Sequence, residues 1–91
     1  MSKQDEKVQE KLFQGLVKSF KSNAEIQLGM KENPLTGENE QNLDQAKYSI
    51  NMLEMLQEKT EGNVAEREKK YLDKVASRMK KKYVEKKMDD E

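Results

Sequence analysis

The stretch LDQAKYSINMLEMLQEKTEGN, residues 43–63, decides the fold. Its apolar residues recur at helical spacing and Gly62 is a natural stop, so it predicts a helix over about 43–61. At about 100° per residue, one face of this helix carries Leu43, Ala46, Ile50 and Leu53. The opposite face carries Tyr48, Met52 and Met55, with Leu56 at its edge. A helix that is apolar on two sides is buried on two sides.

Two arrangements would bury both faces. In a three-helix monomer, this helix would be the central element and both neighbours would pack against it. Alternatively, one face forms the core and the other binds a second subunit. Methionine-rich faces adapt well to a partner helix, although the same side chains would also fill a core within one chain. The candidate interface consists of Tyr48, Met52, Met55 and Leu56.

Helices are also predicted on either side of this stretch. The first, over about 8–29, carries seven apolar residues at spacings of one, three and four. Gly29 would cap its end, and Gly15 inside it would allow another helix to approach closely. The seven residues are Leu12, Phe13, Leu16, Val17, Phe20, Ala24 and Leu28.

The third helix is predicted over about 64–87, with Asn63 and Glu66 as its N-terminal cap. Its apolar face is Leu72, Val75, Ala76, Met79 and Tyr83. Residues 1–7 are expected to be flexible and residues 88–91 to form an acidic tail. The sequence thus predicts one all-α domain over 8–87, a three-helix bundle that packs as a dimer or higher oligomer.

The connection over residues 30–42 contains the only proline of the chain. Asn33 and Pro34 favour a turn, with Gly37 three positions later, so we expect a defined loop rather than a flexible linker. Such a loop can also carry a binding determinant. The residues expected at turns and caps are Asn33, Pro34, Gly37, Gly62 and Asn63.

The composition restricts how the domain can be stabilised. Charged residues make up 40% of the 91 residues and apolar residues only 33%, so the core must be small. Because the chain has no Cys and no His, disulfides are impossible and the usual zinc ligands are missing. A partner subunit is the remaining means of stabilisation, which favours a homo-oligomer.

The same composition argues against catalysis. Without His or Cys, nucleophilic catalysis of the Ser/His or Cys/His type is excluded. The four glycines are isolated, so no phosphate-binding loop is present. Glu54 and Glu58 form a carboxylate pair, but acid–base catalysis needs a desolvated carboxyl and a solvated surface is the simpler interpretation. We therefore expect no enzyme activity, no metal and no cofactor.

The expected location follows from the polarity of the first residues and the absence of long apolar runs. The first eleven residues are too polar for a signal peptide, and no apolar run approaches the roughly 18 residues that a membrane span needs. We expect a soluble, cytoplasmic protein with no membrane partner.

Charge is unevenly distributed along the chain. Residues 34–65 carry two lysines against six acidic residues, whereas residues 66–88 carry ten basic residues against four acidic ones. A stripe on the third helix could follow a phosphate backbone. It could equally be a solvated face, because Glu66, Glu68, Asp73 and Glu85 lie nearby. This candidate basic face consists of Arg67, Lys70, Lys74, Arg78 and Lys81.

Several short motifs occur together and in a fixed order. They are Leu28-Gly29, the run NPLTGE over 33–38, Leu43 with Ala46 and Ile50, the run LEMLQEKTEGN over 53–63, and Tyr83-Val84. From Phe13 to Val84, the chain resembles a small bacterial family, domain of unknown function DUF1844. The resemblance implies a helical, cytoplasmic bacterial protein and supplies no activity.

The chain departs from the pattern of that family in two places. Val64-Ala65 stands where the family is expected to have Leu followed by Ser or Thr, which weakens the start of the third helix. The third helix is also richer in lysine than the resemblance implies, so its basic face is not carried over as a family feature.

From the residues, we predict a non-catalytic helical protein–protein interaction module that self-associates or binds another protein. The alternative is an RNA- or ribosome-associated accessory protein that uses the basic face of the third helix.

Overall fold

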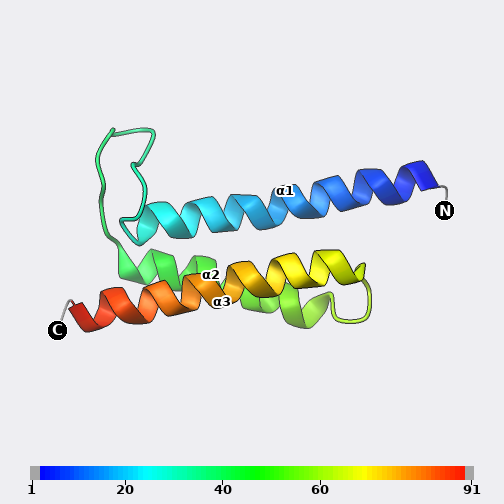
Figure 1. Cartoon of the computed structure of the whole chain (residues 1–91). Helices are drawn as coiled ribbons and strands as arrows, with labels where there is room; N and C mark the ends of the chain where they lie inside the picture. The colour runs from blue at the N-terminus through cyan, green and yellow to red at the C-terminus, as the bar shows by residue number, and fades with distance from the viewer. Residues whose placement is uncertain (1–2, 90–91) are drawn as a thin grey trace.

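The computed structural model describes residues 3–89. Three helices make up the fold: α1 (Lys3–Gln27), α2 (Leu43–Lys59) and α3 (Glu66–Asp89). Each helix contacts the other two, and consecutive helices run antiparallel (Figure 1). The described residues form no strand, only an isolated bridge between Leu28 and Gln41. The predicted all-α three-helix fold is confirmed.

Both long helices extend further than the sequence indicated. Residues 3–7, expected to be a flexible segment, form the first turns of α1. They are all polar or charged, so the hydrophobic periodicity that marked the helix gave no sign of them. Likewise, α3 continues to Asp89, into the stretch predicted as an acidic tail. The ends of the two predicted segments, 1–2 and 90–91, lie outside the described residues.

The core lies between the three helices. On α1 it takes up only part of the broad apolar face, because Val17 and Ala24 are buried whereas Leu12 and Leu16 are exposed. Leu28, directly after α1, is also buried. Gly15 has no atom within 4 Å of where a Cβ would stand, so it does not serve the close helix approach that we expected. The buried apolar residues are Val17, Ala24, Leu28, Ala46, Ile50, Leu53, Leu56, Leu72, Val75, Ala76 and Met79.

The loop between α1 and α2 is held by its own hydrogen bonds. The Asn33 side chain accepts a hydrogen bond from the Leu35 amide at 2.9 Å, and the Asn33 carbonyl accepts one from the Gly37 amide at 2.7 Å. Gly37 has a φ of 72°, in the left-handed region that glycine adopts without strain. The loop therefore has a defined conformation, and it places Leu35 at an exposed position.

The two later helices begin differently. At α2, the Asn42 side chain caps the helix by accepting a hydrogen bond from the Gln45 amide at 3.1 Å. At α3, the capping position is Ala65, not Asn63 as predicted, because the helix begins at Glu66 and the Ala65 carbonyl accepts its first hydrogen bonds, from the Glu68 and Lys69 amides. Ala65 has no side-chain oxygen, so α3 begins without a side-chain N-cap of the kind that α2 has.

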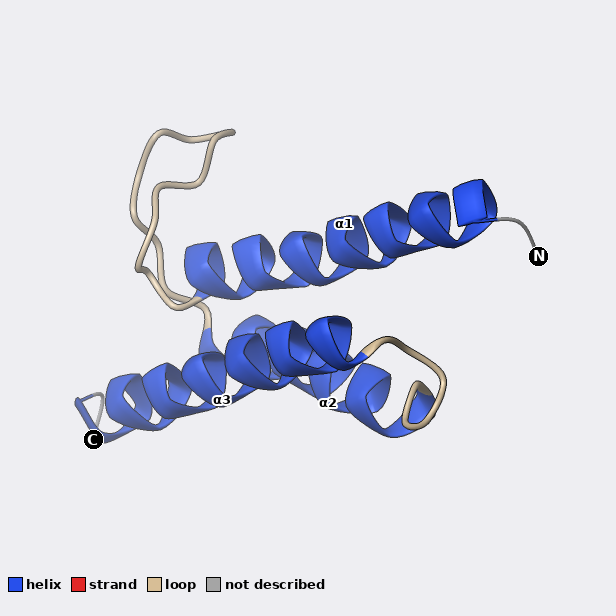
Figure 2. Ribbon diagram, turned by 45° about the vertical axis from the view of Figure 1, so that its right-hand side comes forward, coloured by secondary structure: helices blue, strands red, loops and turns tan. Residues whose placement is uncertain are grey.

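The molecule is long and thin, at 50 × 26 × 16 Å (Figure 2). Its radius of gyration is 14.6 Å, whereas a globular domain of this length has about 12 Å. Its accessible surface is 6644 Å², compared with roughly 5,500 Å² expected for a folded monomer of this mass. The bundle thus exposes an unusually large surface for its size.

Candidate functional site

Polar contacts with the two other helices show which sides of α2 face them. Ser49 is hydrogen-bonded to the Gln27 side chain of α1, with 2.6 Å between the polar atoms. On the other side, the Gln57 amide donates to Asp73 of α3 at 2.8 Å. These contacts place α1 and α3 on two sides of α2 and leave the remaining side facing outward.

The outward side of α2 carries most of the predicted interface. Tyr48 is 66% exposed and Met55 is 37% exposed, while Met52 is half-buried on the flank towards α1. Leu56 is only 8% exposed and belongs to the core, so its assignment to the interface was wrong. The reason is its position on the wheel, about 20° from Ser49, which contacts α1.

The N-terminal half of α1 adds exposed apolar residues that the sequence analysis did not assign to an interface. Leu12 is 68% exposed, and Val8 and Leu16 are exposed as well. Leu16 lies within about 20° of Gln27 on the helical wheel, so it is on the side of α1 that faces α2. We call the following set the outer apolar surface: Val8, Leu12, Leu16, Tyr48, Met52 and Met55.

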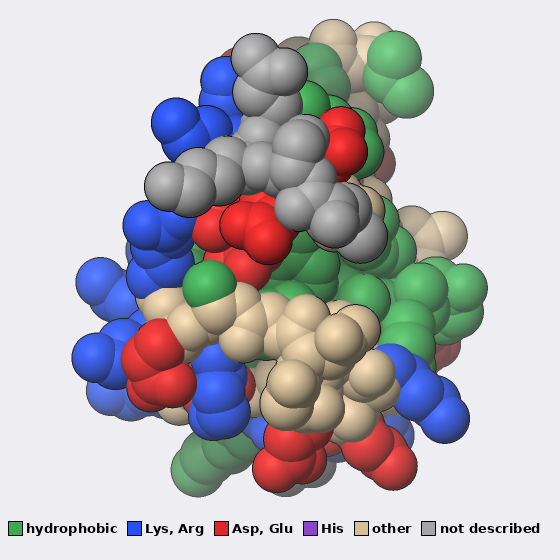
Figure 3. Space-filling view, turned by 90° about the vertical axis from the view of Figure 1, so that its right-hand side faces the viewer, with side chains coloured by type: hydrophobic (Ala, Val, Ile, Leu, Met, Phe, Trp, Pro, Cys, Tyr) green, Lys and Arg blue, Asp and Glu red, His purple; other side chains and the backbone are tan. Residues whose placement is uncertain are grey.

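Charged residues avoid the outer apolar surface. Between Val8 and Gln27, the same side of α1 continues with Ser19, Asn23 and Ile26. On α2, the part of the outward side that adjoins α1 has only uncharged residues between Asp44 and Lys59, at its two ends. Three charged residues, Lys47, Glu54 and Glu58, are exposed on the part towards α3. Figure 3 shows hydrophobic side chains gathered towards one side of the molecule and most Lys and Arg side chains towards the other. Depletion of charge is typical of the centre of a protein interface.

The predicted basic face lies on the exposed side of α3, and all five of its residues are exposed. Arg67 forms an ion pair with Glu10 of α1, and this hydrogen bond raises the pKa of the guanidinium. Among the described residues, no carboxylate lies within ion-pair distance of the other four, Lys70, Lys74, Arg78 and Lys81. The face is thus one continuous basic stripe with a single carboxylate partner at its start.

The acidic residues near this stripe are directed elsewhere. Asp73 accepts hydrogen bonds from Lys69 and Gln57, which lower the pKa of its carboxyl. Glu85 pairs with Lys82 at 3.5 Å. Glu68 is buried, and its carboxylate accepts a hydrogen bond from the Ala65 amide at 2.9 Å. None of these three carboxylates forms an ion pair with a member of the basic face in the described part of the chain.

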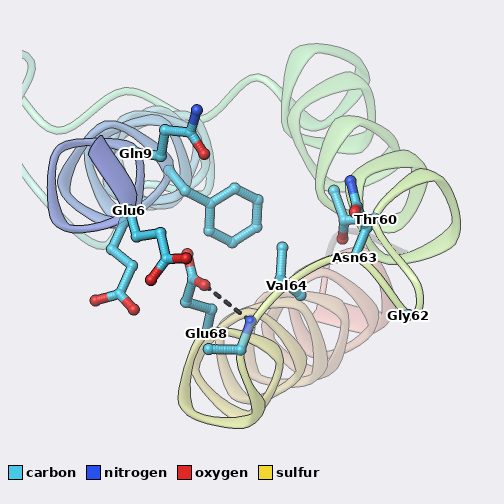
Figure 4. Close-up of a pocket in the computed structure, with 10 residues that line it drawn as sticks. Glu6, Gln9, Thr60, Gly62, Asn63, Val64 and Glu68 are labelled. Carbon is cyan, nitrogen blue, oxygen red and sulfur yellow. Dashed lines mark hydrogen bonds between the residues drawn. The ribbon is translucent and has the colours of Figure 1, made fainter. Parts of the chain in front are cut away.

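A hollow of about 570 Å³ opens at the end of the bundle where α1 begins. Glu6 and Gln9 of α1 lie on one side of it, with the α2–α3 connection on the other (Figure 4). Two of its three carboxylates have structural partners, since Glu10 binds Arg67 and Glu68 binds the Ala65 amide. The described residues contain no cluster of side chains that could hold a metal ion.

The Glu54–Glu58 carboxylate pair borders a second hollow, of about 400 Å³, between α2 and α3. Both residues are exposed, and the Glu54 carboxylate lies 3.6 Å from the Lys80 ammonium. These surroundings leave both carboxyls solvated, whereas acid–base catalysis requires a desolvated carboxyl. Glu54 and Glu58 are therefore surface carboxylates, and Glu54 forms a surface ion pair with Lys80.

A comparison with known protein families identifies the family of the chain. The family model of the domain of unknown function DUF1844 matches residues 10–85. The chain belongs to this family. The match includes α2 and most of α1 and α3, and it confirms the resemblance carried by the sequence motifs. Comparisons with curated proteins and with solved structures give no match.

Membership of the DUF1844 family brings no activity, substrate or partner, because the family is one of unknown function. In the part of the chain that the structure describes, no helix has both the length and the apolar content to cross a bilayer. The function must therefore be inferred from the two exposed helix faces.

Proposed function

We propose that this chain is a non-catalytic helical interaction module that self-associates through the outer apolar surface. The observation that carries the proposal is the uncharged, apolar side of α1 and α2 in a chain with 40% charged residues. Scattered apolar residues are normal on a monomer, but a continuous apolar patch rimmed by polar residues marks an interaction site.

The size of the surface supports the same proposal. A subunit of a standard dimer contributes about 800 Å² to the interface. The accessible surface of this chain exceeds that of an ordinary monomer of its mass by roughly 1,000 Å². An interface of standard size would therefore bring the exposed area per subunit close to the usual value.

The mechanism would be non-covalent. The aromatic ring of Tyr48 and the flexible side chains of Met52 and Met55 would supply the buried contacts, because aromatic and methionine side chains adapt to an apposed helix. The basic residues of α3 are exposed and outside the outer apolar surface, so they would affect the rate of encounter more than the affinity.

A pair of matched substitutions tests the proposal. Tyr48→Glu places a charge on the outer apolar surface, whereas Leu35→Glu places one on a loop residue that is 92% exposed and outside that surface. In sedimentation velocity, we expect the wild type and Leu35→Glu to sediment as oligomers and Tyr48→Glu as a monomer of unchanged helicity. If Tyr48→Glu sedimented like the wild type, the outer apolar surface would not be the interface.

A second candidate function is favoured by the basic face. Four of its residues have no ion-pair partner in the described part of the chain, and they form a continuous stripe, as binding along a phosphate backbone requires. A triple variant, Lys70→Gln, Lys74→Gln and Lys81→Gln, should preserve helicity, because Gln and Lys have similar helix propensity. If the face follows RNA, the log–log salt slope of binding should fall by roughly two to three units.

The chain offers a matched control for that experiment. Lys69, Lys80 and Lys82 each have a carboxylate partner, so their change to Gln removes the same charge from outside the stripe. RNA binding would support the second candidate only if the stripe variant loses it and the control retains it. Because the net charge of the chain is zero, we expect the wild type to bind RNA weakly.

A further inference from the structure

We propose that two copies pair α2 against α2 in antiparallel orientation, about a two-fold axis at the level of Asn51 and Met52. Asp44 of each copy then faces Lys59 of the other. This inference rests on the proposed self-association and specifies its geometry.

The outward side of α2 would form the contact between the two copies. One contact face of a helix is about 100° wide. Successive residues are about 100° apart around the axis, and a strip of that width on this side of α2 contains six residues. These residues are Asp44, Tyr48, Asn51, Met52, Met55 and Lys59.

The strip is symmetric about its centre. Asp44 and Lys59 lie at equal distances from the midpoint between Asn51 and Met52, about 11 Å away at 1.5 Å per residue. Tyr48 and Met55 are also equidistant from it, at about 5 Å. When a second copy of α2 runs in the opposite direction about that midpoint, Tyr48 is at the level of Met55 and Asp44 is at the level of Lys59.

The resulting pairs are chemically complementary. Tyr48 against Met55 brings an aromatic ring to a thioether, a favourable contact in protein interiors. Asp44 against Lys59 joins opposite charges at the rim, where exposed pairs set orientation more than affinity. A parallel arrangement would instead place Asp44 near Asp44 and Lys59 near Lys59, so the charges select the antiparallel one.

Both charged residues are available for such a pair. Asp44 and Lys59 are exposed, and no ion pair among the described residues involves either of them. The pattern also identifies the occupant as a second copy, because the strip complements itself under a two-fold rotation. Interfaces of two-fold dimers have this property, since the same patch serves both subunits.

Charge reversal tests the geometry. Asp44→Lys alone would place two lysines together at each end of the dimer, and Lys59→Asp alone would place two aspartates together. Each variant should dimerise about tenfold more weakly than the wild type, because both rim pairs change from attraction to repulsion. An equimolar mixture of the two variants should restore dimerisation, because in the heterodimer both ends again join opposite charges. An effect on folding alone cannot produce this restoration.

Cross-linking provides an independent measurement. The chain has no Cys, so Asn51→Cys introduces a single thiol beside the proposed axis, and oxidation should link two copies. Ser77→Cys, on an exposed position of α3, is the matched control and should remain uncross-linked.

The outcomes separate this inference from the proposed function. If the wild type is a monomer, self-association itself fails. If the wild type is a dimer but the mixture restores nothing and Asn51→Cys does not cross-link, self-association stands and the antiparallel α2 pairing is refuted. Restored dimerisation together with a specific cross-link supports both.

Discussion

Replacing Ala65 by Ser should stabilise the fold, because Ala65 precedes the first residue of α3 and has no side-chain oxygen to cap the helix. The Ala65 carbonyl accepts hydrogen bonds from the Glu68 and Lys69 amides, both at 3.0 Å, and the Glu68 carboxylate accepts one from the Ala65 amide at 2.9 Å. This is one half of a capping box, and a hydroxyl at position 65 would supply the other half. The gain should be about 1 kcal/mol in the free energy of unfolding, which raises Tm by about 5 °C in a domain of this size.

The assay is thermal unfolding followed by circular dichroism at one fixed protein concentration, since Tm depends on concentration in a self-associating protein. Ala65→Val is the control, because it adds bulk at the same exposed position without an oxygen atom. Asn42→Ala is the converse experiment and should cost about 1 kcal/mol, since it removes the cap that α2 does have. If Ala65→Ser leaves Tm unchanged, or if Ala65→Val raises Tm by the same amount, a side-chain cap at position 65 does not stabilise α3.

Three further substitutions test other parts of the fold by the same unfolding measurement. Gly15→Ala should raise the free energy of unfolding by up to about 1 kcal/mol, because Gly15 is inside α1 and no neighbouring atom lies within 4 Å of the added Cβ. A lower free energy of unfolding would reveal a contact that the structure lacks. Gly62→Val should destabilise by at least about 1 kcal/mol, because the φ of 77° at Gly62 is unfavourable for a β-branched residue, and an unchanged Tm would contradict this. Leu53→Ala should cost about 3 kcal/mol as a fully buried leucine, while Leu35→Ala should change stability by less than about 0.5 kcal/mol; equal effects would mean that the core is misplaced.

The sequence predicted the three helices because local signals marked most of their ends. Asn42 has the side chain of an N-cap, and Gly29 and Gly62 both adopt positive φ where the sequence placed helix ends. The start of α3 was misplaced by two residues. Asn63 is a good capping residue, but its backbone N–H belongs to the turn at Thr60 and α3 begins only at Glu66, which the sequence does not show.

The candidate site was only partly predictable, for a geometric reason. The apolar face of α1 is wider than one neighbour can cover. Which part of such a face is buried depends on where α2 and α3 lie, so Leu12 and Leu16 could not be separated from Val17 by periodicity. Leu56 was misassigned for the same reason, since a residue at the edge of two faces belongs to whichever face the neighbouring helix reaches.

Long-range polar contacts gave no sequence signal at all. The ion pair between Arg67 and Glu10 joins residues 57 positions apart, and nothing local predicts it. It bears on the second candidate function, because it pairs one of the five residues of the proposed phosphate-binding stripe with a carboxylate.

The most direct test of the central claim is the mass of the wild-type chain in solution. Sedimentation equilibrium or light scattering at tens of micromolar should give about twice the 10.7 kDa mass of the chain, with dissociation on dilution. A mass of 10.7 kDa that does not change with concentration would contradict self-association and leave Tyr48, Met52 and Met55 as an ordinary solvated surface.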